Sequence, residues 1–429
     1  MEKFFYPERS KWEEICQRPS FDKSALDSTV FKVLSQVKLG GDKELKSLTS
    51  RFDGVELEDL SVSQKELIEA ADLVNPDLRL AIELAAGNIE KFHKAQLITE
   101  PKITTIKGVN CWRKSLPIEK VGLYIPGGSA PLFSTLLMLA IPAKIAGCKE
   151  IIITTPPDKL GKVNPVILYT ANLLGLDKIF KVGGAQAIAS LAYGSESVPK
   201  VYKIFGPGNQ FVTRAKELVQ QDGIAIDMPA GPSEVLVMAD ETSNPQFVAA
   251  DLLSQAEHGK DSQVILVTNN QSVANDCLAE LEIQLEALPR KEIASAALKN
   301  SKTLVFKTLL EAMRFSNYYA PEHLIISTDE ALKMADKVMN AGSVFIGHYS
   351  CESAGDYASG TNHTLPTNGY ARAYSGVSID SFIKKITFQE LSSEGIQAIG
   401  PSIELMATAE NLEAHKNAVS VRLKSLDNV

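Results

Sequence analysis

The chain has 429 residues, of which 45% are hydrophobic and 22% are charged, so it can bury a large core and should form two or more domains. Its formal net charge of −8 and pI near 5.5 argue against a surface for nucleic acid or anionic membranes, which needs clustered Lys and Arg. The five cysteines are widely spaced without a C-x-x-C pair, which indicates free thiols in a reducing compartment. No targeting segment or membrane-spanning run is apparent, which favours a cytoplasmic protein.

The first half of the chain predicts a helical region followed by a parallel sheet. After an N-terminal segment over residues 1–24, residues 25–100 carry Leu, Ala, Lys and Glu at helical spacing. From residue 120, short apolar runs alternate with Gly or Pro turns and amphipathic stretches, which predicts βαβ units. The first set of these runs is Val121–Ile125, Glu150–Thr154, Lys178–Val182 and Val201–Phe205.

A second set of apolar runs predicts a second parallel sheet. Its members are Glu234–Met238, Gln263–Val267, Thr303–Phe306, His323–Ile326 and Gly342–Ile346. Helices are expected between them, including Pro245–Glu257 and Asp329–Asn340. After about residue 380 a loop-rich stretch leads into a polar helix from about Ser402 to Leu423, which is typical of an arm without a core of its own.

The predicted fold is therefore α/β, with two Rossmann-like parallel-sheet domains, a helical N-terminal region and a C-terminal arm. We assign residues 25–120 and 240–379 to one discontinuous domain, residues 121–239 to the other and residues 380–429 to the arm.

Three glycine-containing turns each follow an apolar run and open a predicted helix. They are Tyr124-Ile-Pro-Gly-Gly-Ser129, Val182-Gly-Gly-Ala-Gln186 and Phe205-Gly-Pro-Gly-Asn-Gln210. Open α/β sheets bind ligands at the carboxyl ends of their strands, and glycine lets the backbone approach a ligand closely. The turns favour a phosphate-bearing cofactor. Because the G-x-G-x-x-G fingerprint and an acidic ribose partner at its usual spacing are both absent, ordinary tight turns are the alternative.

The histidines and their neighbours predict a metal site, since imidazole, carboxylate and carbonyl oxygens together suit zinc. Gln255 and His258 are three apart in a predicted helix and share a face, although a satisfied histidine at a helix end is the alternative. Asp356 and His363 lie in a glycine-containing loop of the kind that carries function, where an Asp is also a common turn former. His415 stands on the polar helix, where a solvated face is the alternative.

The dipeptide Glu322-His323 follows Ala320-Pro321 at a predicted strand start, where two titratable groups could share acid/base work. Adjacent side chains in extended structure point apart, so the two are expected to act on different protons. His93 and His348 have no such neighbours, and we assign them no role.

Over nearly its whole length the chain resembles the histidinol dehydrogenase family. The resemblance is carried by Tyr124-Ile-Pro-Gly-Gly, Val182-Gly-Gly-Ala-Gln-Ala, Phe205-Gly-Pro-Gly-Asn, Pro229-Ala-Gly-Pro-Ser-Glu234, Gln255-Ala-Glu-His-Gly, Ala320-Pro-Glu-His-Leu, the segment Gly355 to Pro366 and His415-Lys-Asn-Ala-Val. It implies an NAD-dependent, zinc-containing enzyme that oxidises L-histidinol through L-histidinaldehyde to L-histidine. No position expected to take part in the chemistry departs from the family's pattern.

The resemblance also implies the roles of individual residues. The zinc ligands would be Gln255, His258, Asp356 and His415, the acid/base pair Glu322 and His323, and the NAD contacts Tyr124, Gln186 and Asn209. Ser233, His323 and Glu410 would join the zinc ligands in contacting histidinol. The family forms intertwined homodimers in which His415 reaches the partner's site. Glu410 and His415 are roughly 140° apart on an ideal helix, so a helix break is expected between them.

For the mechanism we expect His323, with a pKa near neutrality, to accept the hydroxyl proton, Glu322 to activate water for the second oxidation and zinc to orient the substrate. A cysteine thiohemiacetal is the rival for the second oxidation, but neither Cys111 nor Cys148 has a setting that would favour a thiolate. A zinc hydrolase with Glu322 as the base and a non-catalytic small-molecule binding protein are the alternative functions. The role of His363 is left open.

Overall fold

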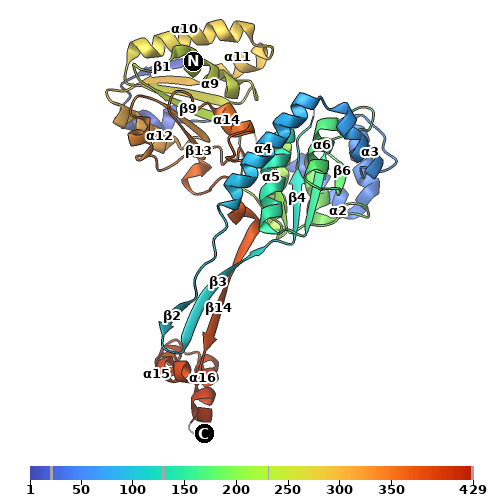
Figure 1. The fold of residues 1–429 in the computed structure, drawn as a ribbon, viewed down its shortest axis with the longest axis vertical. Coiled ribbons are helices and arrows are strands. Elements are labelled where there is room, and N and C mark those ends of the chain that lie inside the picture. Colours follow the sequence, from blue (N-terminus) through green and yellow to red (C-terminus); the bar gives the residue numbers. More distant parts are fainter. Residues whose placement is uncertain (20–22, 128–130, 230, 427–429) are drawn as a thin grey trace.

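The computed structural model describes residues 1–19, 23–127, 131–229 and 231–426. It has two α/β domains, and a long antiparallel stalk extends from one of them to a pair of helices at the C-terminus (Figure 1). Gly128 and Ser129 of the first glycine turn, and Ala230 of the Pro229–Glu234 motif, lie outside the described residues.

One domain is built on a parallel sheet with the strand order β6-β5-β4-β7-β8, called here the five-stranded sheet. Its strands are β4 (Lys120–Tyr124), β5 (Glu150–Thr155), β6 (Ile179–Lys181), β7 (Lys203–Phe205) and β8 (Ala225–Ile226). The helices that join them are α5 (Phe133–Ala146), α6 (Pro165–Leu173), α7 (Gly184–Tyr193) and α8 (Gln210–Gln221). Two separate core clusters line the two faces of this sheet, which explains why its strands read as continuous apolar runs.

The other domain is built on a parallel sheet with the order β1-β11-β10-β9-β12-β13, the six-stranded sheet. Its strands are β1 (Glu2–Phe5), β9 (Glu234–Ala239), β10 (Gln263–Thr268), β11 (Lys302–Val305), β12 (His323–Ser327) and β13 (Ser343–Ile346). Its helices are α1 (Trp12–Ile15), α9 (Pro245–Ala256), α10 (Gln271–Ala287), α11 (Lys291–Lys299), α12 (Leu309–Tyr319), α13 (Ala331–Ala335) and α14 (Glu352–Tyr357). All strands predicted for both sheets are present, and their ends lie within two residues of the prediction.

The helical N-terminal region is also present, and it packs on the five-stranded sheet. It consists of α2 (Lys23–Asp53), α3 (Gln64–Glu69) and α4 (Pro76–Lys94). Ile82 and Ile89 of α4 share a core cluster with α5, and Val33 and Leu45 of α2 share one with α7. Residues 1–19 instead join the six-stranded sheet through β1. This packing differs from the expected division, which joined 25–120 to 240–379 and placed β9 in 121–239, because periodicity identifies a helix but not the sheet that it covers.

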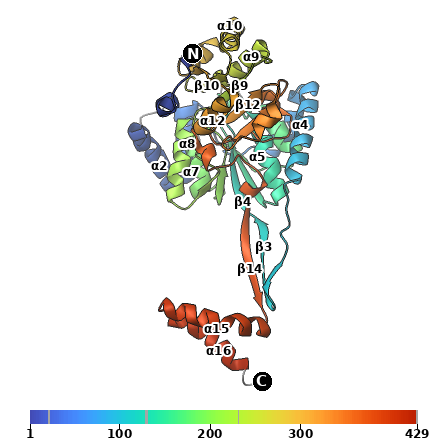
Figure 2. The same cartoon turned by 90° about the vertical axis from the view of Figure 1, so that its left-hand side faces the viewer.

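The stalk is the part that the sequence analysis missed. It is an antiparallel sheet of β2 (Ile103–Ile106), β3 (Val109–Pro117) and β14 (Ile383–Leu391), where a loop-rich stretch was expected after residue 380. Beyond it, α15 (Ser393–Ala409) and α16 (Glu413–Leu426) pack together at the far end from both domains (Figure 2). The predicted break between Glu410 and His415 is confirmed, since Asn411 has φ +58° and α16 starts at Glu413.

Short 3₁₀ segments complete the fold at Arg9–Lys11, Ala70–Leu73, Tyr370–Arg372 and Ile379–Phe382. The helix expected over Asp329–Asn340 is only the short α13. Among the described residues, no helix is both long and apolar enough to cross a membrane.

Candidate active site

The predicted acid/base pair lies at the amino-terminal end of β12, beside the start of β9, and both side chains are buried. Nδ1 of His323 is 3.0 Å from the backbone carbonyl oxygen of Glu234, and the backbone N–H of Glu234 donates to Oε2 of Glu322 at 2.9 Å. Because a carbonyl can only accept, Nδ1 carries a proton, and Nε2 is the basic nitrogen of the neutral ring.

The two side chains lie closer together than expected for neighbours in extended structure. Oε2 of Glu322 is 3.6 Å from Nδ1 of His323, because Glu322 immediately precedes the strand and its carboxylate turns back toward β9. The expectation that the two point apart was therefore wrong. The two groups can still act on different protons, since Nε2 of His323 points away from this contact and lies 3.7 Å from Oδ1 of Asp356.

The pKa of His323 also differs from the near-neutral value that was expected. Burial alone would lower the pKa of His323, but the carboxylates of Glu322, Glu352 and Asp356 outweigh it and raise that pKa well above the usual value. A divalent cation bound to the same carboxylates would offset their charge and act in the opposite direction. The protonation state of His323 therefore depends on what the neighbouring acidic groups bind.

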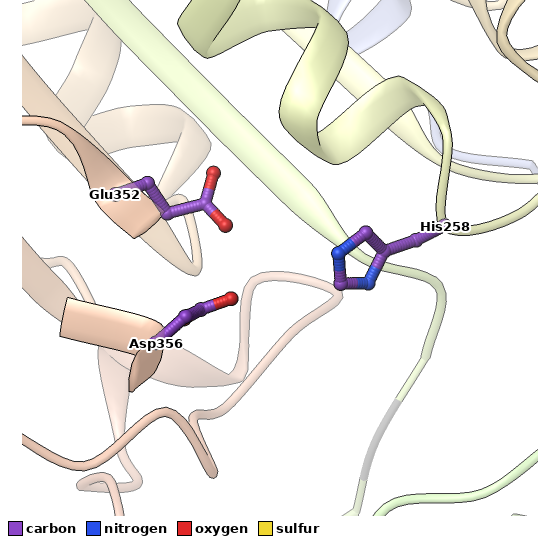
Figure 3. Close-up of side chains that lie close together, drawn as sticks. All are labelled: His258, Glu352 and Asp356. Carbon is purple, nitrogen blue, oxygen red and sulfur yellow. The ribbon is translucent and has the colours of Figure 1, made fainter. Parts of the chain in front are cut away.

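Those acidic groups belong to a cluster that can hold a metal ion. One possible ligand atom each of His258, Glu352 and Asp356 lie within 4.8 Å of one another, and the side chains point toward a common space between the end of α9 and the start of α14 (Figure 3). Gln255 adjoins the cluster, and its Nε2 donates to Oε1 of Glu352. His258 was expected inside a helix, but it lies two residues beyond the end of α9.

The buried polar atoms of this cluster fit a cation. Oε1 of Gln255 and Oδ1 of Asp356 are both buried, and neither has a hydrogen-bond partner among the described residues. An unsatisfied buried acceptor is costly, and two of them beside an imidazole form the nitrogen and oxygen donor set that zinc takes. The residues present therefore fit the metal implied by the resemblance.

Glu352 was not identified from the sequence. It is 1% exposed, and burial raises the pKa of its carboxyl to about 8. It stands four residues before Asp356 in α14, a spacing that places both carboxylates on one face of a helix. That spacing could have revealed it, but the glycines nearby favoured a loop.

His363 lies where the two domains meet. Its Nδ1 is 3.0 Å from the backbone oxygen of Asp356, and its Nε2 is 3.2 Å from the hydroxyl of Thr135 on α5. Burial lowers the pKa of His363. Next to it, Nδ2 of Asn362 donates to the carbonyl of Met138 at 2.6 Å. The loop that follows α14, the helix with two members of the metal cluster, is thus attached to the other domain.

One implied zinc ligand, His415, and one implied substrate contact, Glu410, are not brought to this cluster within one chain. His415 and Glu410 are exposed on the helical pair at the end of the stalk, far from both domains (Figure 1). Ser233 does lie nearby, because it immediately precedes Glu234 and its carbonyl accepts from the backbone N–H of Gln263 at 3.1 Å.

The implied NAD contacts gather at the carboxyl edge of the five-stranded sheet. Tyr124 ends β4, Gln186 lies in the first turn of α7, and Asn209 caps α8 by accepting from the N–H groups of Phe211 and Val212. β4 is flanked by β5 on one side and β7 on the other, so the connections diverge there. Such a switch point is where open α/β sheets bind nucleotides.

The turn after β7 is held from several sides. Gly206 has φ +128°, and a Cβ there would lie 2.1 Å from the carbonyl oxygen of Tyr124, so only glycine fits. Its N–H donates to Asp227 at 2.9 Å, and its carbonyl accepts from Lys216 at 2.9 Å. Lys216 and Asp227 form a buried ion pair. This arrangement presents the start of α8 in a fixed position.

The settings of Cys148 and Cys111 do not support a catalytic cysteine. Burial raises the pKa of Cys148 to about 11, which opposes a thiolate. Cys111 lies on β3 in the stalk.

Zinc binding should strengthen as the pH rises toward about 8 and should release protons. Below that pH the carboxyl of Glu352, with its pKa raised to about 8, is largely protonated, and the neighbouring carboxylates raise the pKa of His323 above its usual value, so a cation must compete with protons. Calorimetric titration of the metal-free protein in two buffers of different ionisation enthalpy measures the release. The Glu352→Gln variant should release fewer protons. Binding that is independent of pH between about 6 and about 8 would contradict this account.

Comparisons with known proteins agree with this geometry. The sequence profile of the family described as histidinol dehydrogenase matches residues 16–423. The chain is 60% identical over 421 residues to histidinol dehydrogenase from Bacteroides fragilis, covering 98% of each chain, and 52% identical over 417 residues to that of Campylobacter jejuni, covering 96% of each. The crystal structure of histidinol dehydrogenase from Elizabethkingia anophelis superposes with a TM-score of 0.98 at 57% identity, over 100% of this chain and 99% of that one.

Proposed function

The chain belongs to the histidinol dehydrogenase family, and from that premise we propose that it oxidises L-histidinol through L-histidinaldehyde to L-histidine, in histidine biosynthesis, with reduction of two NAD. The observation that carries this proposal is the buried Glu322–His323 pair beside two unsatisfied oxygens, those of Gln255 and Asp356. It combines an acid/base pair with a set of metal donors at one place.

The metal proposed is zinc. Gln255, His258 and Asp356 would hold it together with His415 of the partner subunit, and Glu352 orients Gln255 through their hydrogen bond. When bound, zinc would fix the imidazole and the amine of histidinol and so place the hydroxymethyl carbon for reaction. Ser233 and Glu410 are proposed as further substrate contacts.

In the first oxidation His323 acts as the base. Its Nε2 takes the hydroxyl proton while the carbon gives up its hydrogen and an electron pair to NAD, which leaves the aldehyde. The N–H at Nδ1 keeps donating to the carbonyl of Glu234, which opposes a turn of the ring that would present the wrong nitrogen.

In the second oxidation Glu322 takes a proton from water as the water adds to the aldehyde carbon. His323 returns the proton that it took in the first oxidation to the aldehyde oxygen, which completes the hydrate. It then accepts a proton from a hydroxyl of the hydrate while the same carbon gives up its second hydrogen and electron pair to a second NAD, which leaves the carboxylic acid. The backbone N–H of Glu234 fixes one oxygen of the Glu322 carboxylate, which leaves the other oxygen for water. For NAD we propose Tyr124, Gln186 and Asn209 as contacts, at the carboxyl edge of the five-stranded sheet.

We propose a homodimer in which the stalk exchanges the helical pairs. The stalk holds α15 and α16 away from their own domains, and Leu405 and Met406 of α15 and Leu412 between the two helices are exposed. Exposed apolar side chains on a projecting arm are typical of a surface that packs against another subunit. Such an exchange would bring His415 of the partner subunit to the metal cluster.

The test is to incubate the zinc-loaded protein with L-histidinol and NAD and to identify the products by NMR. L-Histidine formed only when NAD is present supports the proposal. A product formed without NAD would favour the zinc hydrolase, and no product from folded, metallated protein would favour a binding protein.

A further inference from the structure

A buried arginine from the N-terminal segment lies directly behind the acid/base pair. The side chain of Arg18 is 11% exposed and that of its partner Glu234 is 2% exposed. Nε of Arg18 donates to Oε1 of Glu234 at 2.5 Å, and Nη2 donates to Oε2 at 3.0 Å. This two-point pairing fixes the carboxylate plane, which a single hydrogen bond would not do.

Glu234 is the residue whose backbone binds both members of the pair. Its N–H donates to Glu322, and its carbonyl accepts from Nδ1 of His323. A rotation of Glu234 would therefore disturb two groups at once. These are the Glu322 carboxylate, proposed to activate water, and the His323 imidazole, proposed to accept the hydroxyl proton. The side-chain pairing with Arg18 opposes that rotation.

Arg18 also holds the turn that leads into the pair. Nη2 donates to the carbonyl of Tyr319 at 2.8 Å and lies 3.4 Å from that of Ala320. Ala320 has φ +56°, a left-handed conformation that a residue with a side chain adopts only when its surroundings impose it. One guanidinium thus contacts both segments that position Glu322 and His323.

Tyr319 and Asn368 add further contacts around Arg18 and Glu234. Its guanidinium stacks over the ring of Tyr319 at 3.9 Å, and the hydroxyl of Tyr319 donates to Gln263 at 2.8 Å. The backbone N–H of Asn368 donates to Oε1 of Glu234 at 2.8 Å. Burial raises the pKa of Glu234 while the charge of Arg18 opposes this, so loss of the guanidinium would leave a buried carboxylate close to Glu322 with no cation.

We propose that Arg18 is a positioning residue for the oxidation, acting through Glu234 to hold Glu322 and His323 in their reactive orientation. This inference rests on the proposed function. Arg18 does not reach the metal cluster or the edge that is proposed for NAD, so its loss should slow the chemistry and leave the binding of substrate, metal and cofactor nearly unchanged.

The test compares Arg18→Gln, Arg18→Lys and the control Arg372→Gln. Arg372 donates to the carbonyl of Tyr318 and lies over its ring at 5.5 Å. It therefore makes the same two kinds of contact as Arg18, but it is exposed and does not contact Glu234. Arg18→Gln should lower kcat by about 10- to 100-fold, the usual effect of a displaced catalytic group, with the KM for histidinol and the zinc content within about twofold of the wild type. Arg18→Lys should recover part of kcat, because an ammonium keeps the charge but lacks the two-point fork. Arg372→Gln should keep wild-type kcat.

Wild-type kcat in folded Arg18→Gln would overturn the inference, and so would a fall in kcat that matches a fall in zinc content or a rise in KM. If Arg18→Gln does not fold, Arg18→Lys decides: a lowered kcat at unchanged KM supports the inference, and an unchanged kcat overturns it. Wild-type protein that fails to oxidise histidinol would instead overturn the proposed function, so the two failures are distinct.

Discussion

Replacing His323 with Asn should lower kcat by about a thousandfold, within the range for loss of a general base. The carboxamide N–H of Asn can take over the hydrogen bond to the carbonyl of Glu234, so local packing is kept while the basic Nε2 is lost. The effect should fall on both oxidations, because in each of them His323 accepts the proton whose loss accompanies transfer of the hydrogen to NAD. Single-turnover measurements starting from histidinol and from histidinaldehyde separate the two.

Glu322→Gln is the matched comparison for His323→Asn. It keeps an acceptor for the N–H of Glu234 but cannot take a proton from water, so the aldehyde should form and then accumulate. Zinc content and NAD affinity, measured on both variants, should equal those of the wild type. If His323→Asn slowed only hydration of the aldehyde and left both hydrogen transfers intact, the roles assigned to these residues would be wrong.

Hybrid dimers should regain the formation of L-histidine from two chains that have each lost it, since Glu322→Gln stops at the aldehyde. His415→Ala removes the residue proposed to reach the other subunit, and Glu322→Gln disables the site on its own domain. In a hybrid of these two chains, one site combines wild-type Glu322 with wild-type His415 and the other site lacks both. Hybrids purified through two different tags should therefore show about half of the wild-type kcat per dimer.

One outcome of the same experiment would contradict the shared site. If His415 served the site of its own chain, each site of the hybrid would carry one substitution, and the hybrid would be as inactive as the two parents. Sedimentation of the purified hybrid confirms that it is a dimer. Exposed His415, at the end of the stalk and away from its own metal cluster, is the structural reason to expect restored activity.

Much of the fold could be predicted because the central strands of both parallel sheets are buried on both faces. Val235, Leu236 and Val237 of β9 are all fully buried, which makes the strand a continuous apolar run that a periodicity analysis detects. The stalk has no such signal. In β14 the segment Lys384–Lys385 and most residues after it are exposed, so its pairing with β3 depends on partners far away in the sequence.

The same reasoning separates the site residues that were predicted from those that were not. His258 and Asp356 were predicted because imidazole and carboxylate groups stood in distinctive motifs. Glu352 and Arg18 stand in no such motif. Their roles follow from burial and from contacts with residues about 100 and about 200 positions away, which only the folded chain brings together.

The proposal that one zinc-dependent site carries out both oxidations is tested most directly by the number of NADH formed per L-histidinol consumed. The measurement is made on the purified protein, then after chelation and again after zinc is returned. Two NADH per histidinol, lost on chelation and restored by zinc, is the result expected. One NADH would mean that the aldehyde leaves and that Glu322 does not activate water, and a ratio that is unaffected by complete removal of the metal would contradict the metal site.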